Sequence, residues 1–272
     1  MSHSFDIHEN GLSGEVTGEG RPVVLLHGLT ATRRYVLQGS GLLARRGFEL
    51  ASYDARGHGA SAPASDPGAY EYSQLVEDLR SVLDLLELDR PVLAGSSMGA
   101  ATALALALGD PDRFSALVQI TPAYEGEPRA EPGDLAEWDA LAGALDEEDI
   151  DAFLELSGVN KIPERYRDAA LTAVRQRLER HRHPGAVADA LRVVPRSAAF
   201  DGLDLLEGLD IPALIVGSRD DTDPGHPLAV AESYAQRLPR ARLVVEDEGE
   251  PPLAWRGSSL SKAIAEFLSD PP

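Results

Sequence analysis

Two patterns of apolar and polar positions alternate along this chain. Short runs rich in Val, Leu, Ile and Ala are apolar at nearly every position, whereas a strand with one solvated face would carry a polar residue at every second position. Continuous apolar runs predict strands covered on both faces, as in a parallel sheet. They occupy Arg21–Gly28, Phe48–Asp54, Pro91–Ser97, Phe114–Ile120, Ile211–Ser218 and Ala241–Glu246.

Helical patterns separate these predicted strands. In the segment Ser73–Leu88, apolar residues recur three or four positions apart and fall on one stripe of a helix. Further helices are expected over Ala100–Leu108, Pro227–Leu238 and Leu260–Leu268. This βαβ alternation implies right-handed crossovers and predicts the α/β class, with a doubly wound, mostly parallel sheet.

One long segment, from about Tyr124 to Phe200, has no strand pattern. It begins with the Pro-, Gly- and charge-rich stretch EGEPRAEPGD and continues with helical stretches such as Arg165–Arg180. We therefore predict a helical cap or lid at 123–199, inserted into an α/β core formed by 1–122 and 200–272.

Composition narrows the possible partners. The chain has 272 residues, 43% of them hydrophobic and 26% charged, which is ordinary for a globular protein. A net charge of −20 disfavours nucleic acid and anionic membranes as partners. The apolar runs are too short to cross a bilayer, and no export signal is visible, so a cytoplasmic location is expected. The absence of cysteine excludes disulfides, thiolate metal sites and a cysteine nucleophile.

The clearest chemical motif is GSSMG, Gly95–Gly99, which matches Gly-x-Ser-x-Gly with Ser97 at its centre. It lies between an apolar strand and an Ala-rich helix. In that context a tight turn lifts the serine into a strained, exposed position, and the helix N-terminus directs backbone N–H groups at developing negative charge. Ser97 is the candidate nucleophile; an ordinary strand-to-helix turn is the alternative interpretation.

Two further motifs follow earlier strands. In LLHGLT, Leu25–Thr30, the backbone N–H of Leu29 could face Ser97 and bind a tetrahedral oxyanion together with the N–H of Met98. His27 in this motif is interpreted as a packed, hydrogen-bonded loop residue. YDARGHGAS, Tyr53–Ser61, suits a tight turn, in which we expect structural roles for Asp54, Arg56 and His58.

The motifs HGLT, DARGHGAS and GSSMG, in this order and spacing, resemble those of the α/β-hydrolase superfamily. The resemblance covers about residues 20–122 and 200–270, and the insertion falls where that family places its helical cap. It implies an α/β-hydrolase fold. Most members are esterases, lipases, lactonases and related acyl-cleaving enzymes; a minority perform other chemistry or are non-enzymatic ligand receptors.

The resemblance also implies the order serine, acid, histidine along the chain. GSRDDTDP, Gly217–Pro224, resembles the acid turn of the family, with Asp220 at the acid position and Asp221 and Asp223 as neighbouring alternatives. The histidine is expected after the strand Ala241–Glu246, in a Gly-His pair, but the pair reads Gly249–Glu250. No histidine follows His226, so the usual triad cannot be assembled from the usual elements.

The candidate bases differ in chemistry. Glu250 is a poor substitute, because a carboxylate is a much weaker base than imidazole and would face Asp220 with no cation between them. His226 lies just before a predicted helix, at the rim of the expected site, and is the preferred base; a locally packed loop histidine is the alternative. His181 and His183 could reach in from the lid, but we expect them at a solvated helix end.

No metal-ligand spacing, phosphate loop or dinucleotide fingerprint occurs, so no metal and no cofactor is predicted. The first functional hypothesis is a cofactor-free serine hydrolase that cleaves an ester, lactone or related acyl bond of a small molecule. The second is a hydrolase-fold ligand-binding protein that has lost its base. The intact GSSMG and HGLT motifs favour the enzyme, and Glu250 favours the binding protein.

Overall fold

A computed structural model describes residues 2–7, 11–159, 162–219, 225–248, 255 and 257–272. Within these residues an eight-stranded sheet has the order β1-β2-β4-β3-β5-β6-β7-β8. Pairing is parallel from β4 to β8, while β1 and β2 pair antiparallel. The strands are β1 (Ser2–Ile7), β2 (Leu12–Gly18), β3 (Arg21–Leu26), β4 (Phe48–Asp54), β5 (Val92–Ser96), β6 (Ala116–Ile120), β7 (Ala213–Gly217) and β8 (Ala241–Val245).

The expected mostly parallel sheet is confirmed, and β3 to β8 coincide with the predicted apolar runs. Strands β1 and β2 were not predicted from the sequence. Burial alternates along β2, with Leu12, Gly14 and Val16 turned inward. This short alternation is weak in sequence, and β1 is mostly exposed at the sheet edge.

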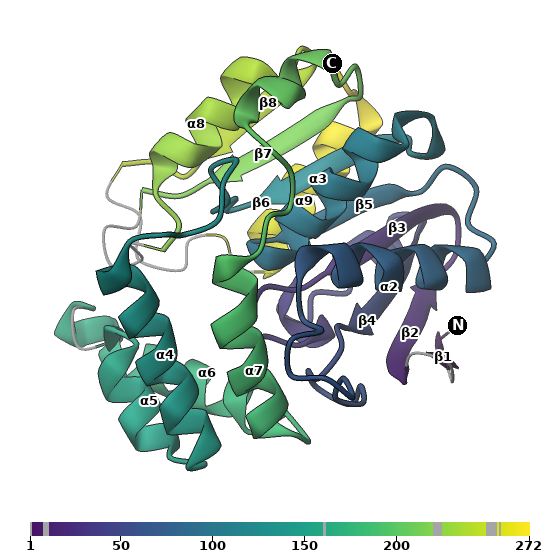
Figure 1. Cartoon of the computed structure of the whole chain (residues 1–272). Coiled ribbons are helices and arrows are strands. Elements are labelled where there is room, and N and C mark those ends of the chain that lie inside the picture. Colours follow the sequence, from purple (N-terminus) through teal and green to yellow (C-terminus); the bar gives the residue numbers. More distant parts are fainter. Residues whose placement is uncertain (1, 8–10, 160–161, 220–224, 249–254, 256) are drawn as a thin grey trace.

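Helices cover both faces of the sheet, which explains why its strands are apolar throughout. On β5, Leu93 joins the core beneath one face, while Val92 and Ala94 join the core beneath the other. Figure 1 shows α2, α3 and α8 in front of the sheet and α9 behind it. These helices are α2 (Tyr72–Leu85), α3 (Met98–Gly109) and α8 (Leu228–Arg237) on one face, and α1 (Leu42–Arg45) and α9 (Gly257–Ser269) on the other.

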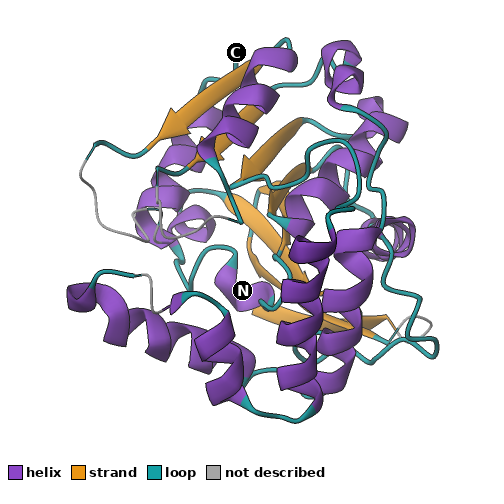
Figure 2. Cartoon of the chain, turned by 60° about the vertical axis from the view of Figure 1, so that its left-hand side comes forward, coloured by secondary structure: helices purple, strands orange, loops and turns teal. Residues whose placement is uncertain are grey.

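A group of cap-like helices follows β6 and precedes β7. They form a separate layer beside the sheet (Figures 1 and 2) and share a hydrophobic cluster that includes Phe153, Leu178 and Leu191. They are α4 (Pro132–Asp146), α5 (Ile150–Leu156), α6 (Glu164–Leu178) and α7 (Pro184–Val193). Leu29 of the core packs against this cluster. The helical insertion is thus present; its treatment as a separate domain at 123–199 stays a prediction.

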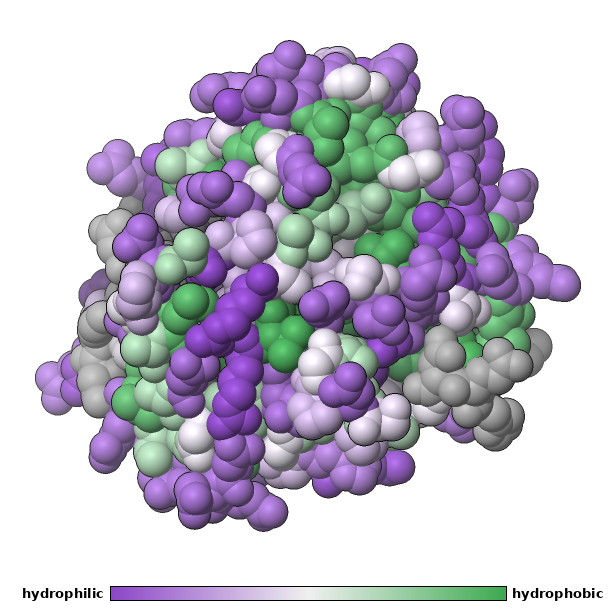
Figure 3. Space-filling model, in the orientation of Figure 1, coloured by the Kyte–Doolittle hydropathy of each residue, from purple (hydrophilic) through white to green (hydrophobic). Residues whose placement is uncertain are grey.

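Short 3-10 helices occupy several connections: η1 (Arg33–Tyr35), η2 (Pro111–Arg113), η4 (Val194–Arg196) and η5 (Leu203–Gly208). Hydrophilic side chains cover most of the face seen in Figure 3. Among the residues that the structure describes, no helix has the length and apolar character that a membrane span requires.

Candidate active site

Ser97 lies at the sharp turn between β5 and α3. Its backbone has φ 51° and ψ −112°, a conformation that L-residues rarely adopt. The turn is held at the sheet, because the Ser97 N–H donates to the carbonyl of Ile120 on β6 at 3.1 Å. Its other end is the start of α3, where the carbonyl of Ser97 accepts from the N–H of Ala101 at 3.0 Å.

Glycines make this turn possible. A Cβ on Gly95 would lie 2.2 Å from the carbonyl oxygen of Gly99, and a Cβ on Gly99 would lie 2.4 Å from the carbonyl oxygen of Leu26. Both clashes are with backbone, so they could be relieved only by separating α3 from β5 and β3. The helix and the sheet can therefore approach this closely around Ser97 only because both flanking positions of GSSMG are glycine.

The predicted oxyanion donors flank Ser97. Met98 is the first residue of α3, where a backbone N–H has no acceptor within the helix. Gly28, just before Leu29, is close to the serine: a Cβ on Gly28 would lie 3.3 Å from the Cβ of Ser97. No hydrogen bond within the described residues engages the N–H of Leu29. The adjacent Thr30 has φ 66°, unusual for a β-branched residue.

A cavity of about 820 Å³ opens above Ser97 and extends beneath the cap. Leu29, Thr30, Ser97, Met98 and His226 line its floor. Many of the cap residues that line the cavity are apolar or aromatic, and we call this part of its lining the apolar arm: Trp138, Leu141, Phe153, Val159, Ile162, Tyr166, Ala170 and Val174. Its volume is in the range of pockets that bind small molecules.

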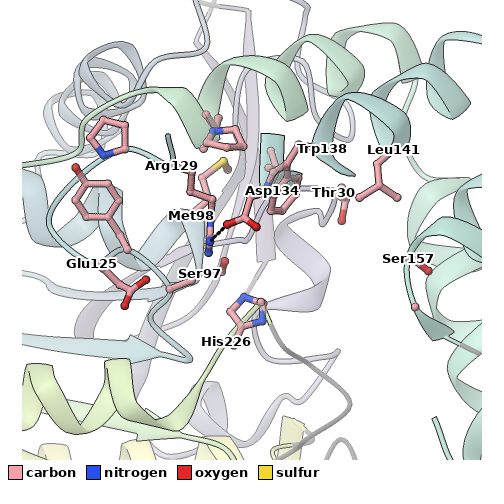
Figure 4. Close-up of a pocket in the computed structure, with 18 of the residues that line it drawn as sticks. Thr30, Ser97, Met98, Glu125, Arg129, Asp134, Trp138, Leu141, Ser157 and His226 are labelled. Atoms are coloured by element: carbon pink, nitrogen blue, oxygen red, sulfur yellow. Dashed lines mark ion pairs between the residues drawn. The ribbon is translucent and has the colours of Figure 1, made fainter. Parts of the chain in front are cut away.

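His226 is the predicted base that the structure brings into the same cavity as Ser97. It precedes α8, and Figure 4 shows its imidazole on the side of Ser97 opposite the cap residues Arg129 and Asp134. Those two cap residues form an ion pair of 3.5 Å (Figure 4). Arg129 therefore places a guanidinium on the cavity wall across from the imidazole.

Other predicted site residues lie outside the described residues: Asp220, its neighbours Asp221 and Asp223, and Glu250. Glu246, which directly follows β8, was not predicted as a site residue. Its carboxylate accepts hydrogen bonds from the hydroxyl of Ser218 at 2.8 Å, the backbone N–H of Arg219 at 2.5 Å and the indole N–H of Trp255 at 3.2 Å. Glu246 thus binds the turn that leads to Asp220. No local sequence signal distinguishes it from the other acids of EDEGE.

The prediction that both lid histidines lie at a solvated helix end is correct for His183 and wrong for His181. His183 is exposed, but His181 is 8% exposed and lies inside the molecule. The ring of His58 lies between those of His27 and His181. Its centroid is 5.1 Å from that of His27 and 5.6 Å from that of His181. His181 is buried because the turn between α6 and α7 packs on two core loops. The contacts come from Thr30 and Gly59, which lie 151 and 122 positions away in the sequence, so no local pattern predicts them.

The loop roles predicted for the other residues of these motifs are observed. His27 is buried; it accepts a hydrogen bond from the N–H of Ala55 at its Nε2 (2.9 Å), which leaves its Nδ1–H to donate to the carbonyl of Gly28 (2.8 Å). Asp54 accepts from the backbone N–H groups of Arg33 and Ala60. Each of these contacts shapes a turn of the core.

Buried imidazoles give this fold a pH-dependent stability. Burial lowers the pKa of His181 from 6.5 to about 4. It also lowers the pKa values of His27 and His58. As the pH falls below 6.5, the unfolded chain takes up protons that the folded chain excludes. The contribution of neutral His181 to the free energy of unfolding is therefore fully present above pH 6.5. It is lost progressively as the pH approaches 4.

We expect His181 alone to account for about 2.5 kcal/mol of the loss in unfolding free energy between about pH 7 and about pH 4.5, from about 1.36 kcal/mol per pKa unit. Urea unfolding at about pH 7 and about pH 4.5 measures this loss. His181→Gln should show a smaller loss than the wild type, and the exposed His183→Gln should match the wild type. Equal losses in all three proteins would contradict the assignment.

Several features define the class of protein: the β5–Ser97–α3 turn, the loop after β3 that lies beside Ser97, and the cap-like helices over the carboxyl edge of a mostly parallel sheet. The chain matches the alpha/beta hydrolase fold family over residues 21–257. It belongs to that family. The predicted family and fold are thereby confirmed, while the place of Glu250 at the position of the family's histidine stays a prediction.

Individual relatives agree with this assignment. YisY of Bacillus subtilis, an AB hydrolase superfamily protein, is 31% identical over 133 residues, which cover 47% of this chain and 49% of YisY. RutD of Caulobacter segnis, a proposed carbamate hydrolase, is 28% identical over 237 residues, covering 85% of this chain and 86% of RutD. The chain thus spans about half of one relative and most of the other.

Among solved structures, the enol-lactonase from Burkholderia xenovorans superposes with a TM-score of 0.79 at 23% identity, covering 98% of this chain and all of that one. An esterase from Exiguobacterium antarcticum superposes with a TM-score of 0.76 at 20% identity, covering 95% and 96% of the two chains. At these identities the likeness is one of fold.

Proposed function

We propose that this protein is a cofactor-free hydrolase that cleaves an ester, lactone or related acyl bond of a small molecule. The observation that carries the proposal is the strained backbone of Ser97 at the floor of a cavity of about 820 Å³. In this mechanism Ser97 attacks the carbonyl carbon, and the N–H groups of Leu29 and Met98 stabilise the oxyanion. The enol-lactonase and esterase folds among the similar structures support an acyl substrate.

The base in this proposal is His226, which shares the cavity with Ser97. It takes the proton of the serine hydroxyl during attack and returns it to the leaving group. Asp220 is proposed as the acid that orients the imidazole, and the hydrogen bonds of Glu246 to Ser218 and Arg219 support the turn that carries it. Glu250 takes no part in proton transfer.

Active-site labelling tests the proposal. A fluorophosphonate should label the wild type in a one-to-one ratio at Ser97, identified by peptide mass spectrometry, and should not label Ser97→Ala. Turnover of p-nitrophenyl acetate should accompany labelling. A wild type that is neither labelled nor active would contradict the proposal.

A ligand-binding protein is the second candidate function, favoured by Glu250 at the position where the resemblance predicts the histidine. The variant Glu250→His separates the two. If the chain is a silenced hydrolase, this variant gains labelling and turnover that the wild type lacks. If His226 is the base, the wild type is active and His226→Ala removes most of its activity while Glu250→His adds little.

The apolar arm of the cavity suggests which acyl groups are accepted. The lining from Trp138 on α4 to Val174 on α6 is mostly apolar, with Ser157 among it, so an alkyl chain attached to the reacting carbonyl would bury its methylenes there. Each buried methylene contributes about 0.8 kcal/mol, or about fourfold in kcat/KM. We therefore expect p-nitrophenyl octanoate to be a better substrate than the acetate.

Filling the arm tests this preference. Val174→Trp should lower kcat/KM for the octanoate by about tenfold or more, the value of two or so methylenes, and leave the acetate within about twofold. Ala173→Trp is the matched control, because residue 173 is exposed on the same helix. An equal effect of Val174→Trp on both esters would show that the chain does not enter this arm.

A further inference from the structure

The turn between α6 and α7 is joined to two core loops by buried hydrogen bonds. The Nε2 atom of His181 lies 3.0 Å from the carbonyl oxygen of Thr30, and the Nδ1 atom lies 2.9 Å from the backbone nitrogen of Gly59. The N–H of Arg182 also donates to the carbonyl of Gly59 at 3.0 Å. A single cap histidine thus bridges the loop after β3 and the loop after β4.

The partners of His181 define where its proton lies. The backbone N–H of Gly59 is a donor, so Nδ1 must be the acceptor and the proton of the neutral ring is on Nε2. That proton faces the carbonyl of Thr30. Burial keeps the ring neutral by lowering its pKa to about 4. The charged and titratable groups around it are His27, His58, Asp54 and Arg177.

Thr30 belongs to the turn that carries the Leu29 N–H. In a trans peptide the C=O of Gly28 and the N–H of Leu29 point in opposite directions, so hydrogen bonds to the Gly28 oxygen direct that N–H. The Gly28 oxygen accepts from the N–H of Ala31 at 3.0 Å and from Nδ1 of His27 at 2.8 Å. One end of the turn is therefore fixed within the core.

The other end of this turn depends on the cap. Thr30 has φ 66°, a conformation that a β-branched residue keeps only when its surroundings impose it. The hydrogen bond from His181 engages the Thr30 carbonyl, and Thr30 is 7% exposed. His181 thus supplies, from 151 residues away, a restraint on Thr30 in addition to the hydrogen bond between Ala31 and Gly28 within the turn.

We propose that His181 is a positioning residue, which anchors the turn 28–31 to the cap so that the N–H of Leu29 stays directed at the oxyanion. It touches neither substrate nor the reacting atoms. The inference rests on the proposed hydrolase function for its kinetic consequence, and the turn's rigidity provides a test that does not depend on activity.

Two substitutions separate the two hydrogen bonds. In His181→Gln the side-chain amide can still donate near the Nε2 position, to Thr30. In His181→Asn the side-chain oxygen can still accept near the Nδ1 position, from Gly59. Each variant loses one buried hydrogen bond, so a purely structural role predicts equal effects on thermal stability and on kcat. His183→Gln and His183→Asn are the matched controls, because His183 is exposed.

The positioning role predicts a difference. For p-nitrophenyl acetate, kcat of His181→Asn should fall by about 10- to 100-fold with KM within about twofold, whereas His181→Gln should stay within about threefold of the wild type. Amide hydrogen exchange of residues 28–31 should be faster in His181→Asn than in His181→Gln. Equal kcat values together with equal exchange would overturn the proposal.

Two further outcomes keep this inference distinct from the proposed function. If the wild type has no turnover and no labelling of Ser97, the hydrolase proposal fails while the exchange comparison still decides the role of His181. If His181→Asn does not fold, the wild type decides: the 15N chemical shifts of the His181 ring should be those of the neutral Nε2–H tautomer. A proton on Nδ1 would overturn the inference.

Discussion

Ser97→Ala is expected to lower kcat for p-nitrophenyl acetate by about four to six orders of magnitude, to the residual rate that oxyanion stabilisation and binding supply. The hydroxyl is the only group removed, and the glycines around the turn still allow α3 to pack closely against β5. His226→Ala should lower kcat by about 10² to 10⁴, the usual contribution of a positioned base. Steady-state kinetics measure both.

Neighbouring residues provide matched controls for these variants. Ser96→Ala also removes a serine hydroxyl, one residue earlier, but from a side chain that does not line the cavity. His183→Ala removes an exposed imidazole. Both should retain the wild-type kcat within about threefold. Full activity in Ser97→Ala would exclude Ser97 as the nucleophile, and full activity in His226→Ala would exclude only that base.

Asp78→Ala is expected to destabilise the fold by about 3–5 kcal/mol, because it leaves the charge of Arg56 buried without its partner. Asp78 is 1% exposed and accepts two hydrogen bonds of 2.7 Å from the guanidinium of Arg56. Burial alone would lower the pKa of Arg56, but the hydrogen bonds to Asp78 raise it above the usual value. Urea denaturation measures the change in unfolding free energy.

The same helix offers a control for this prediction. Asp84 of α2 forms an ion pair with Arg113, and its side chain is 67% exposed. Asp84→Ala should therefore cost less than about 1 kcal/mol. In the double variant Arg56→Met/Asp78→Ala, the uncompensated charge is gone, so the loss should be smaller than in Asp78→Ala alone. A similar loss for Asp78→Ala and Asp84→Ala would show that burial of the pair contributes little.

Local patterns predicted the parts of the fold that local chemistry specifies. Continuous apolar runs identified β3 to β8, since a strand covered on both faces has no solvated position. The glycines of GSSMG identified the turn at Ser97, because only glycine lets α3 approach β5 and β3 so closely. β1 and β2 were missed, since one lies at the exposed sheet edge and the other alternates over few residues.

The sequence by itself determined the layered sheet, the helical insertion and the strained serine, because each depends on residues close together in the chain. Only the tertiary structure decided that His181 is buried against Thr30, that Glu246 binds the turn at Ser218, and that His226 shares a cavity with Ser97. These contacts join distant segments. The segments meet because their apolar faces pack together and exclude water, and no spacing of residue types along one segment encodes that meeting.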